Sequence, residues 1–161
     1  MTLEQLETFV KEHGQPKFRA GQLFQWLHAR RVDSFSEMTD QPKGFLGVLE
    51  EECTIERLSV QQCQISKDGT RKYLFSLPDG NCIETVWMQY SYGNTVCVST
   101  QVGCRMGCRF CASTQCGKVS DLTAGEIAGE IYAVMKDTGQ RVSHIVLMGI
   151  GEPLDNFENV L

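Results

Sequence analysis

The chain has 161 residues, a formal charge of −5, 42% hydrophobic residues and 22% charged residues. This composition excludes a disordered or low-complexity chain and predicts one or two small folded domains. No run approaches the roughly 20 apolar residues that span a bilayer, and the acidic N-terminus is unlike a signal peptide, so we expect a cytoplasmic protein with no membrane contact. Eight cysteines are too few for a disulfide scaffold and more than an ordinary cytosolic core requires, so we expect some of them to carry chemistry.

The first part of the chain has helical periodicity over residues 3–30, with a break at Gly14-Gln15-Pro16, and again over residues 45–52. Four basic residues and no acid lie between residues 17 and 31, together with three aromatic residues. One interpretation is an amphipathic helix that packs Leu23, Phe24, Trp26 and Leu27 inward. The other is a polyanion contact, because lysine and arginine displace counterions from phosphates. The basic residues are Lys17, Arg19, Arg30 and Arg31.

The pattern then changes to period two and predicts strands over residues 59–65, 71–77, 82–89 and 95–102. Hairpin turns are predicted at residues 67–69 and 78–80. A Thr123/Glu126 capping box starts a helix that reaches Gly139, and residues 143–148 are typical of a buried parallel strand. The last strand, long loop, helix and strand make one βαβ unit. A barrel-type parallel fold needs about 200 residues or more, so we expect a fragment or natural truncation of a longer enzyme.

The main chemical signal is a run of three cysteines, Cys104, Cys108 and Cys111, in a loop just after a predicted strand. Three thiolates with C-x3-C-x2-C spacing can each hold one iron of a cubane cluster and leave the fourth iron open. The alternative is a zinc site in which Cys116 supplies a fourth thiolate. The spacing favours the cluster, because zinc knuckles usually have two C-x2-C pairs on separate hairpins.

A second signal, Gly149-Ile150-Gly151-Glu152-Pro153, lies at the C-terminal end of the predicted strand 143–148. Ligands of parallel α/β folds bind outside these strand ends. The glycines leave backbone groups open to a ligand, and Glu152 can accept hydrogen bonds from an ammonium group. By itself this segment favours an ordinary glycine-rich turn with a solvated glutamate.

Taken together, the C-x3-C-x2-C run and Gly151-Glu152-Pro153 resemble the radical S-adenosylmethionine (SAM) enzymes. The wider strings beginning at Cys97, Leu122 and His144 resemble one branch of them, the dual-specificity RNA methyltransferases. That branch methylates C2 of an adenine in 23S ribosomal RNA and, in many members, in tRNA. Residues 18–27 resemble its N-terminal helical accessory domain, and residues 79–86 its strand leading into the barrel. The resemblance covers nearly the whole chain.

The resemblance implies two cofactors, a 4Fe-4S cluster on Cys104, Cys108 and Cys111, and SAM. It places Phe110, Gly151 and Glu152 at the cofactor, Cys97 as the thiol that releases the product, and Glu84 as the proton acceptor. The methyl-carrying cysteine of the family would lie beyond Leu161. The implied partners are RNA and an external electron donor, and we expect a monomer.

The resulting expectation is an α/β chain with two parts. Residues 1–92 would form a helical accessory domain followed by a β-meander, and residues 93–161 would begin a radical SAM barrel of partial TIM type. Three alternatives stay open: another radical SAM enzyme, a zinc-bearing RNA-binding module, and an inactive fragment that keeps only cluster and RNA affinity.

Overall fold

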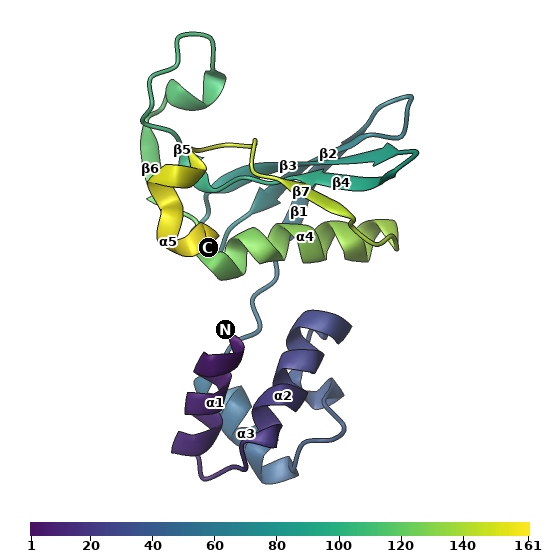
Figure 1. The fold of residues 1–161 in the computed structure, drawn as a ribbon, viewed down its shortest axis with the longest axis vertical. Helices are drawn as coiled ribbons and strands as arrows, with labels where there is room; N and C mark the ends of the chain where they lie inside the picture. Colours follow the sequence, from purple (N-terminus) through teal and green to yellow (C-terminus); the bar gives the residue numbers. More distant parts are fainter. The chain divides into compact units, whose positions relative to one another are not determined.

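The computed structural model describes residues 1–161, which divide into two compact units, residues 1–57 and residues 58–161 (Figure 1). Each unit has its own cluster of buried hydrophobic side chains. None of the helices in either unit is long and apolar enough to cross a bilayer.

The N-terminal unit is helical, as expected. It contains α1 (Leu3–Glu12), α2 (Phe18–Phe24), which continues as a π-helical segment to Arg30, and α3 (Lys43–Glu52). Thr2 and Gln5 cap the start of α1 reciprocally. Leu23 and Trp26 are buried, and Phe24 and Leu27 pack against the same core, so the amphipathic interpretation of this segment is confirmed.

The second unit is built on a five-stranded sheet with the order β1-β2-β3-β4-β7. Its strands are β1 (Ser59–Ile65), β2 (Arg71–Ser76), β3 (Cys82–Tyr90), β4 (Gly93–Cys97) and β7 (His144–Val146). Strands β1 to β4 pair antiparallel, through the expected turns, and β4 pairs parallel with β7. The expected βαβ connection is therefore confirmed, with α4 (Ala124–Thr138) between the paired strands.

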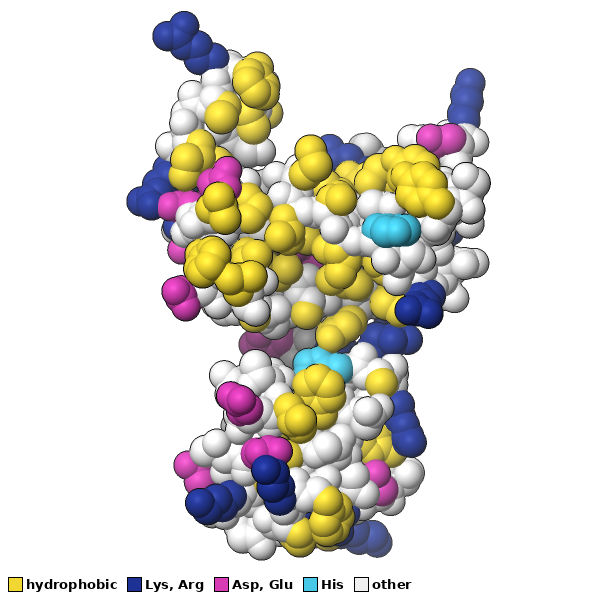
Figure 2. Space-filling view, in the orientation of Figure 1, with side chains coloured by type: hydrophobic (Ala, Val, Ile, Leu, Met, Phe, Trp, Pro, Cys, Tyr) yellow, Lys and Arg dark blue, Asp and Glu magenta, His cyan; other side chains and the backbone are white.

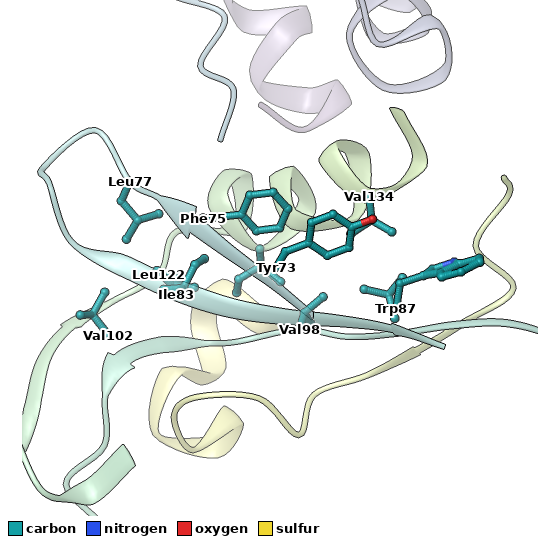
Figure 3. Close-up of a cluster of buried hydrophobic side chains, with 11 residues drawn as sticks. Tyr73, Phe75, Leu77, Ile83, Trp87, Val98, Val102, Leu122 and Val134 are labelled. Carbon is teal, nitrogen blue, oxygen red and sulfur yellow. The ribbon is translucent and has the colours of Figure 1, made fainter. Parts of the chain in front are cut away.

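One face of this sheet packs against α4. The side chains of β2 and β3 alternate, so Tyr73, Phe75, Ile83 and Trp87 point into the core together with Val134 of α4 (Figure 3). The intervening residues of β3, including Glu84 and Val86, face away from α4 and are half-buried. The sheet thus has one covered face and one open face.

Two expectations about strands need correction. Residues 95–102 form two strands, because β4 ends at Cys97 and β5 (Gln101–Gly103) pairs instead with β6 (Lys118–Asp121), which the sequence did not predict. Residues 143–148 are not a buried strand: only 144–146 are extended, and Ile145 is 52% exposed. Strand β7 pairs only with β4, so it is the edge of the sheet.

The boundary between compact units also differs from the expected one at 92/93. Residues 92 and 93 lie at the hairpin that joins β3 to β4, where Val86 to Tyr90 pair with Gly93 to Cys97 in a continuous ladder. The β-meander therefore belongs to the same sheet as the βαβ unit. The spatial division falls at 57/58, after the helical part.

Candidate functional site

The predicted ligand residues lie on one loop, residues 104–116, here called the cysteine loop. It connects β5 to β6 and projects beyond the ends of these strands (Figure 1). The Cys104 N–H donates to the Gly117 carbonyl at 3.1 Å and closes the base of the loop. Gly103 has φ +73°, and a Cβ atom there would lie 1.9 Å from the Gly117 oxygen. The close approach of the two backbones therefore requires glycine at position 103.

The three cysteines differ in exposure: Cys104 is buried, Cys111 is half-buried and Cys108 is exposed. The Cys111 N–H donates to the Cys108 carbonyl at 3.1 Å, which turns this part of the loop back on itself. All eight cysteines of the chain are free thiols. The donor set of three thiols within eight residues fits three irons of a cluster in type and number.

The side chains are not, however, arranged as a metal site. No three His, Cys, Asp or Glu side chains in the structure form a group that could hold a metal ion. Cys116 lies at the far end of the same loop and is exposed. The loop therefore fits a cluster by the type and number of its thiol donors, and not by the arrangement of their side chains.

Exposed apolar side chains flank this loop and the end of β7. Phe110 is 94% exposed and Met148 is 81% exposed. In Figure 2 hydrophobic side chains gather on the visible face of the second unit. Single exposed apolar residues are ordinary, but a gathered set is typical of a surface that another molecule or segment covers. Phe110 is thus accessible to a ligand, as its predicted cofactor contact requires.

The second predicted segment, residues 149–153, here called the glycine turn, packs tightly against the strand ends. A Cβ atom at Gly149 would lie 2.6 Å from the Val98 carbonyl oxygen. Gly151 has φ +106° and would meet Gln101 at 2.7 Å. The carboxylate of Glu152 accepts the Leu154 N–H at 3.1 Å and caps the short helical turn Pro153–Asn156. Close packing therefore explains why both positions hold glycine, since a Cβ atom at either one would overlap a neighbouring residue.

A polar network joins the glycine turn to the base of the cysteine loop. The buried Gln101 amide accepts the Glu152 N–H at 3.0 Å and donates to Asp155 at 2.9 Å. The Asp155 carboxylate is 8% exposed. It also forms ion pairs with Lys118, at 3.1 Å, and with Arg105 of the cysteine loop. The hydrogen bond from Gln101, followed by that from Arg105, lowers the pKa of Asp155 to about 2. The two predicted cofactor segments are therefore held together by protein groups.

Glu84 and Cys97, the predicted proton acceptor and releasing thiol, lie on adjacent strands. Cys97 is the pairing partner of Val86, two residues along β3 from Glu84. Strand alternation places both side chains on the open face of the sheet. Glu84 forms an ion pair with Lys72 at 2.7 Å. Burial raises the pKa of the Cys97 thiol above its ordinary value.

A buried acid, Glu130 of α4, lies beneath these strands and was not singled out by sequence reasoning. It is fully buried, and it accepts hydrogen bonds from Thr85 and from the Ser99 N–H. Burial raises the pKa of Glu130 from 4.5 to about 8, against the opposing effect of these hydrogen bonds. An acid on the same helix face as Ile127 and Val134 was the signal that could have revealed it.

This raised pKa predicts a pH-dependent stability. The unfolded carboxyl group loses its proton near pH 4.5, and the folded one holds it to about pH 8, so the free energy of unfolding should fall as pH rises across that window. The slope should reach at most about 1.4 kcal/mol per pH unit. Burial raises the pKa of the nearby Cys97 thiol and so moves its titration further above this window. Urea denaturation at several pH values should show this slope in the wild type and its loss in Glu130→Gln. Equal slopes in both chains would contradict the prediction.

The four cations of the predicted polyanion contact differ in how exposed they are and in which protein groups they contact. Lys17 is exposed and forms an ion pair with Glu7 at 2.9 Å. The Arg30 guanidinium lies 3.8 Å from the centre of the Trp26 ring. Arg19 donates to the Asp40 carbonyl at 2.6 Å, and Arg31 is half-buried. Exposed ion pairs such as that of Lys17 are weak, so Lys17 and Arg30 are the most available cations for an anionic ligand.

Comparisons with known proteins agree over the whole chain. Residues 1–55 match the family model described as the ribosomal RNA large subunit methyltransferase N-terminal domain. A probable dual-specificity RNA methyltransferase RlmN from Desulforamulus reducens is 51% identical over 98% of this chain and 45% of its own length. The corresponding Streptococcus thermophilus protein is 52% identical over 100% of this chain and 43% of its length.

A solved structure shows the same fold. The crystal structure of a radical SAM methyltransferase from Sphaerobacter thermophilus has a TM-score of 0.89 and 38% identity, over 99% of this chain and 48% of that chain. The mixed α/β fold is therefore that of a radical SAM methyltransferase, and the chain spans about half the length of the relatives it matches. These matches and the N-terminal family model show that the chain corresponds to the N-terminal half of RlmN proteins, whose curated members are named probable dual-specificity RNA methyltransferases.

Proposed function

We propose that this chain carries the RNA-binding helical unit and the cofactor-binding segments of a radical SAM enzyme that methylates C2 of adenine in 23S ribosomal RNA and tRNA. The observation that carries the proposal is the network of Gln101 and Asp155, which joins the cysteine loop to the glycine turn. Hydrogen bonds and an ion pair thus join the two segments that the resemblance assigns to the cofactors, which supports their acting together.

In this proposal Cys104, Cys108 and Cys111 hold a 4Fe-4S cluster and leave one iron open. When bound, the cluster supplies the electron for reductive cleavage of SAM, chemistry that C2 of adenine requires because it offers no nucleophile. Gly151 leaves backbone groups accessible, Glu152 accepts the SAM ammonium group and Phe110 covers the cofactor. The exposure of the Phe110 ring supports its role. The hydrogen bond from the Glu152 N–H to the Gln101 side chain supports the roles of Gly151 and Glu152, because it fixes the glycine turn.

Two further residues act on the substrate. Glu84 accepts the proton that C2 loses. The Cys97 thiolate then attacks the sulfur that joins the adduct to a cysteine outside residues 1–161, so that a disulfide forms, the sulfur–carbon bond breaks and the released carbon takes up a proton. The common position of Glu84 and Cys97 on the open face of adjacent strands supports this pairing. Lys72 holds the Glu84 carboxylate on that face. An external electron donor and a cytoplasmic location belong to the same proposal.

The RNA-binding part predicts a change in salt dependence. Removing one phosphate contact should reduce the slope of log affinity against log salt by about 0.7–0.9. A variant with Lys17, Arg19, Arg30 and Arg31 replaced by glutamine should therefore bind an RNA hairpin more weakly and with a shallower slope. Fluorescence anisotropy over a range of salt concentrations measures both.

A matched control removes three exposed cations of the second unit, Lys67, Lys136 and Arg141. This control should keep the wild-type slope. Unchanged affinity and slope in the variant of the helical unit, or an equal reduction in the control, would refute the assignment of the RNA contact to residues 17–31.

A further inference from the structure

The buried face of α4 contains an acid where an apolar residue would be expected. Ile127, Glu130 and Val134 are its buried residues, and Glu130 is 0% exposed. Removing a carboxyl group from water is costly unless hydrogen bonds within the protein replace those to solvent. The contacts of Glu130 therefore indicate what this acid does in the fold.

Oxygen Oε2 of the Glu130 carboxyl group makes both hydrogen bonds of this side chain. It accepts the Thr85 hydroxyl, and it accepts the Ser99 N–H at 3.0 Å. Ser99 lies just past the end of β4, where the strand ladder no longer supplies a partner for its N–H. Buried N–H groups need such a partner, so Glu130 completes the backbone hydrogen bonding at this point. The other oxygen, Oε1, has no partner.

Ser99 connects Glu130 to the candidate site through the hydrogen bonds of its hydroxyl group. Its hydroxyl donates to the Glu84 carbonyl at 2.7 Å and accepts the Ile150 N–H at 3.0 Å. Ile150 lies inside the glycine turn, and Ser99 follows Cys97 by two residues. Thr85, the other partner of Glu130, is adjacent to Glu84. A single acid is thus connected to all three segments that carry Glu84, Cys97 and Gly151.

We propose that Glu130 is a positioning residue of the candidate site. Through Thr85 and Ser99 it fixes where Glu84 and the glycine turn lie relative to Cys97, and it does so from the opposite face of the sheet, without contact to substrate or cofactor. The proposal rests on the proposed function, because Glu84, Cys97 and Gly151 are site residues only under it.

Three variants separate this role from simple packing. Glu130→Gln keeps the size of the side chain and one carbonyl oxygen that can accept both hydrogen bonds. Glu130→Met keeps the approximate length and removes every acceptor. Ser99→Ala leaves the Ser99 N–H bond to Glu130 in place and removes only the hydroxyl contacts to Glu84 and Ile150.

The measurement is amide hydrogen exchange by NMR in the whole chain, with neither cofactor nor RNA. In Glu130→Met the amides of residues 99 and 150 should exchange at least about tenfold faster. The Ser99 N–H loses its acceptor, and the Ser99 hydroxyl that binds the Ile150 N–H is no longer held in place. The Leu77 amide, bonded to the Asn81 carbonyl in a distant turn, is the internal control and should not change. Glu130→Gln should keep the wild-type exchange rates. Ser99→Ala should accelerate exchange of the Ile150 amide alone.

Two outcomes would overturn the proposal. Equal acceleration of Ile150 and Leu77 in Glu130→Met would mean that the acid only stabilises the unit as a whole. An unchanged Ile150 rate would mean that the restraint is not passed on through Ser99. Failure here is distinguishable from failure of the proposed function, which is decided by the metal that the cysteine loop binds.

Discussion

Replacing Gly103 with alanine is expected to prevent the base of the cysteine loop from closing. The residue has φ +73°, which costs a residue with a Cβ atom about 1–2 kcal/mol, and the added Cβ would lie 1.9 Å from the Gly117 oxygen. That oxygen belongs to the backbone and accepts the Cys104 N–H, so it cannot move aside without breaking the hairpin. With an overpacking cost of about 1–3 kcal/mol, the total destabilisation should be about 2–5 kcal/mol.

Gly107 provides a matched control within the same loop. It has φ +71°, and nothing lies within 4 Å of a Cβ atom built there. Gly107→Ala should therefore show only the conformational part, about 1–2 kcal/mol. Urea denaturation of the two variants measures the difference. Equal destabilisation would show that the approach of Gly103 to Gly117 does not hold the loop.

The second large effect concerns the ligands themselves. Serine in place of Cys104, Cys108 or Cys111 should abolish cluster binding after anaerobic reconstitution, because each thiolate is expected to hold a different iron. Cys116→Ser, at the end of the same loop, and Cys63→Ser, on exposed β1, are the controls and should keep the full iron content. Loss of the metal in Cys116→Ser, with retention in any of the first three variants, would reverse the assignment.

The local features of this fold were predictable because their causes are local. The Lys-Asp-Gly and Pro-Asp-Gly turns set the hairpins of β1 to β3, and the Thr123/Glu126 capping box starts α4 where expected. The cysteine run and the glycine turn are short motifs, so their residue types and spacing could be recognised in the sequence.

What could not be predicted depends on partners far apart in the sequence. The split between β4 and β5 follows from the pairing of Gln101 with Asp121, and the exposure of Ile145 from the position of β7 at an edge. Asp155 meets Arg105 across 50 residues, and Glu130 meets Ser99 across 31. Periodicity cannot reveal such contacts, although they hold the candidate site together.

The most direct test of the central claim is the metal and sulfide content of the wild-type chain. Anaerobic reconstitution with iron and sulfide should give a brown protein with about four iron and four inorganic sulfide per chain. Stoichiometric zinc in a colourless protein, released by Cys116→Ala, would contradict the claim and identify the loop as a zinc site.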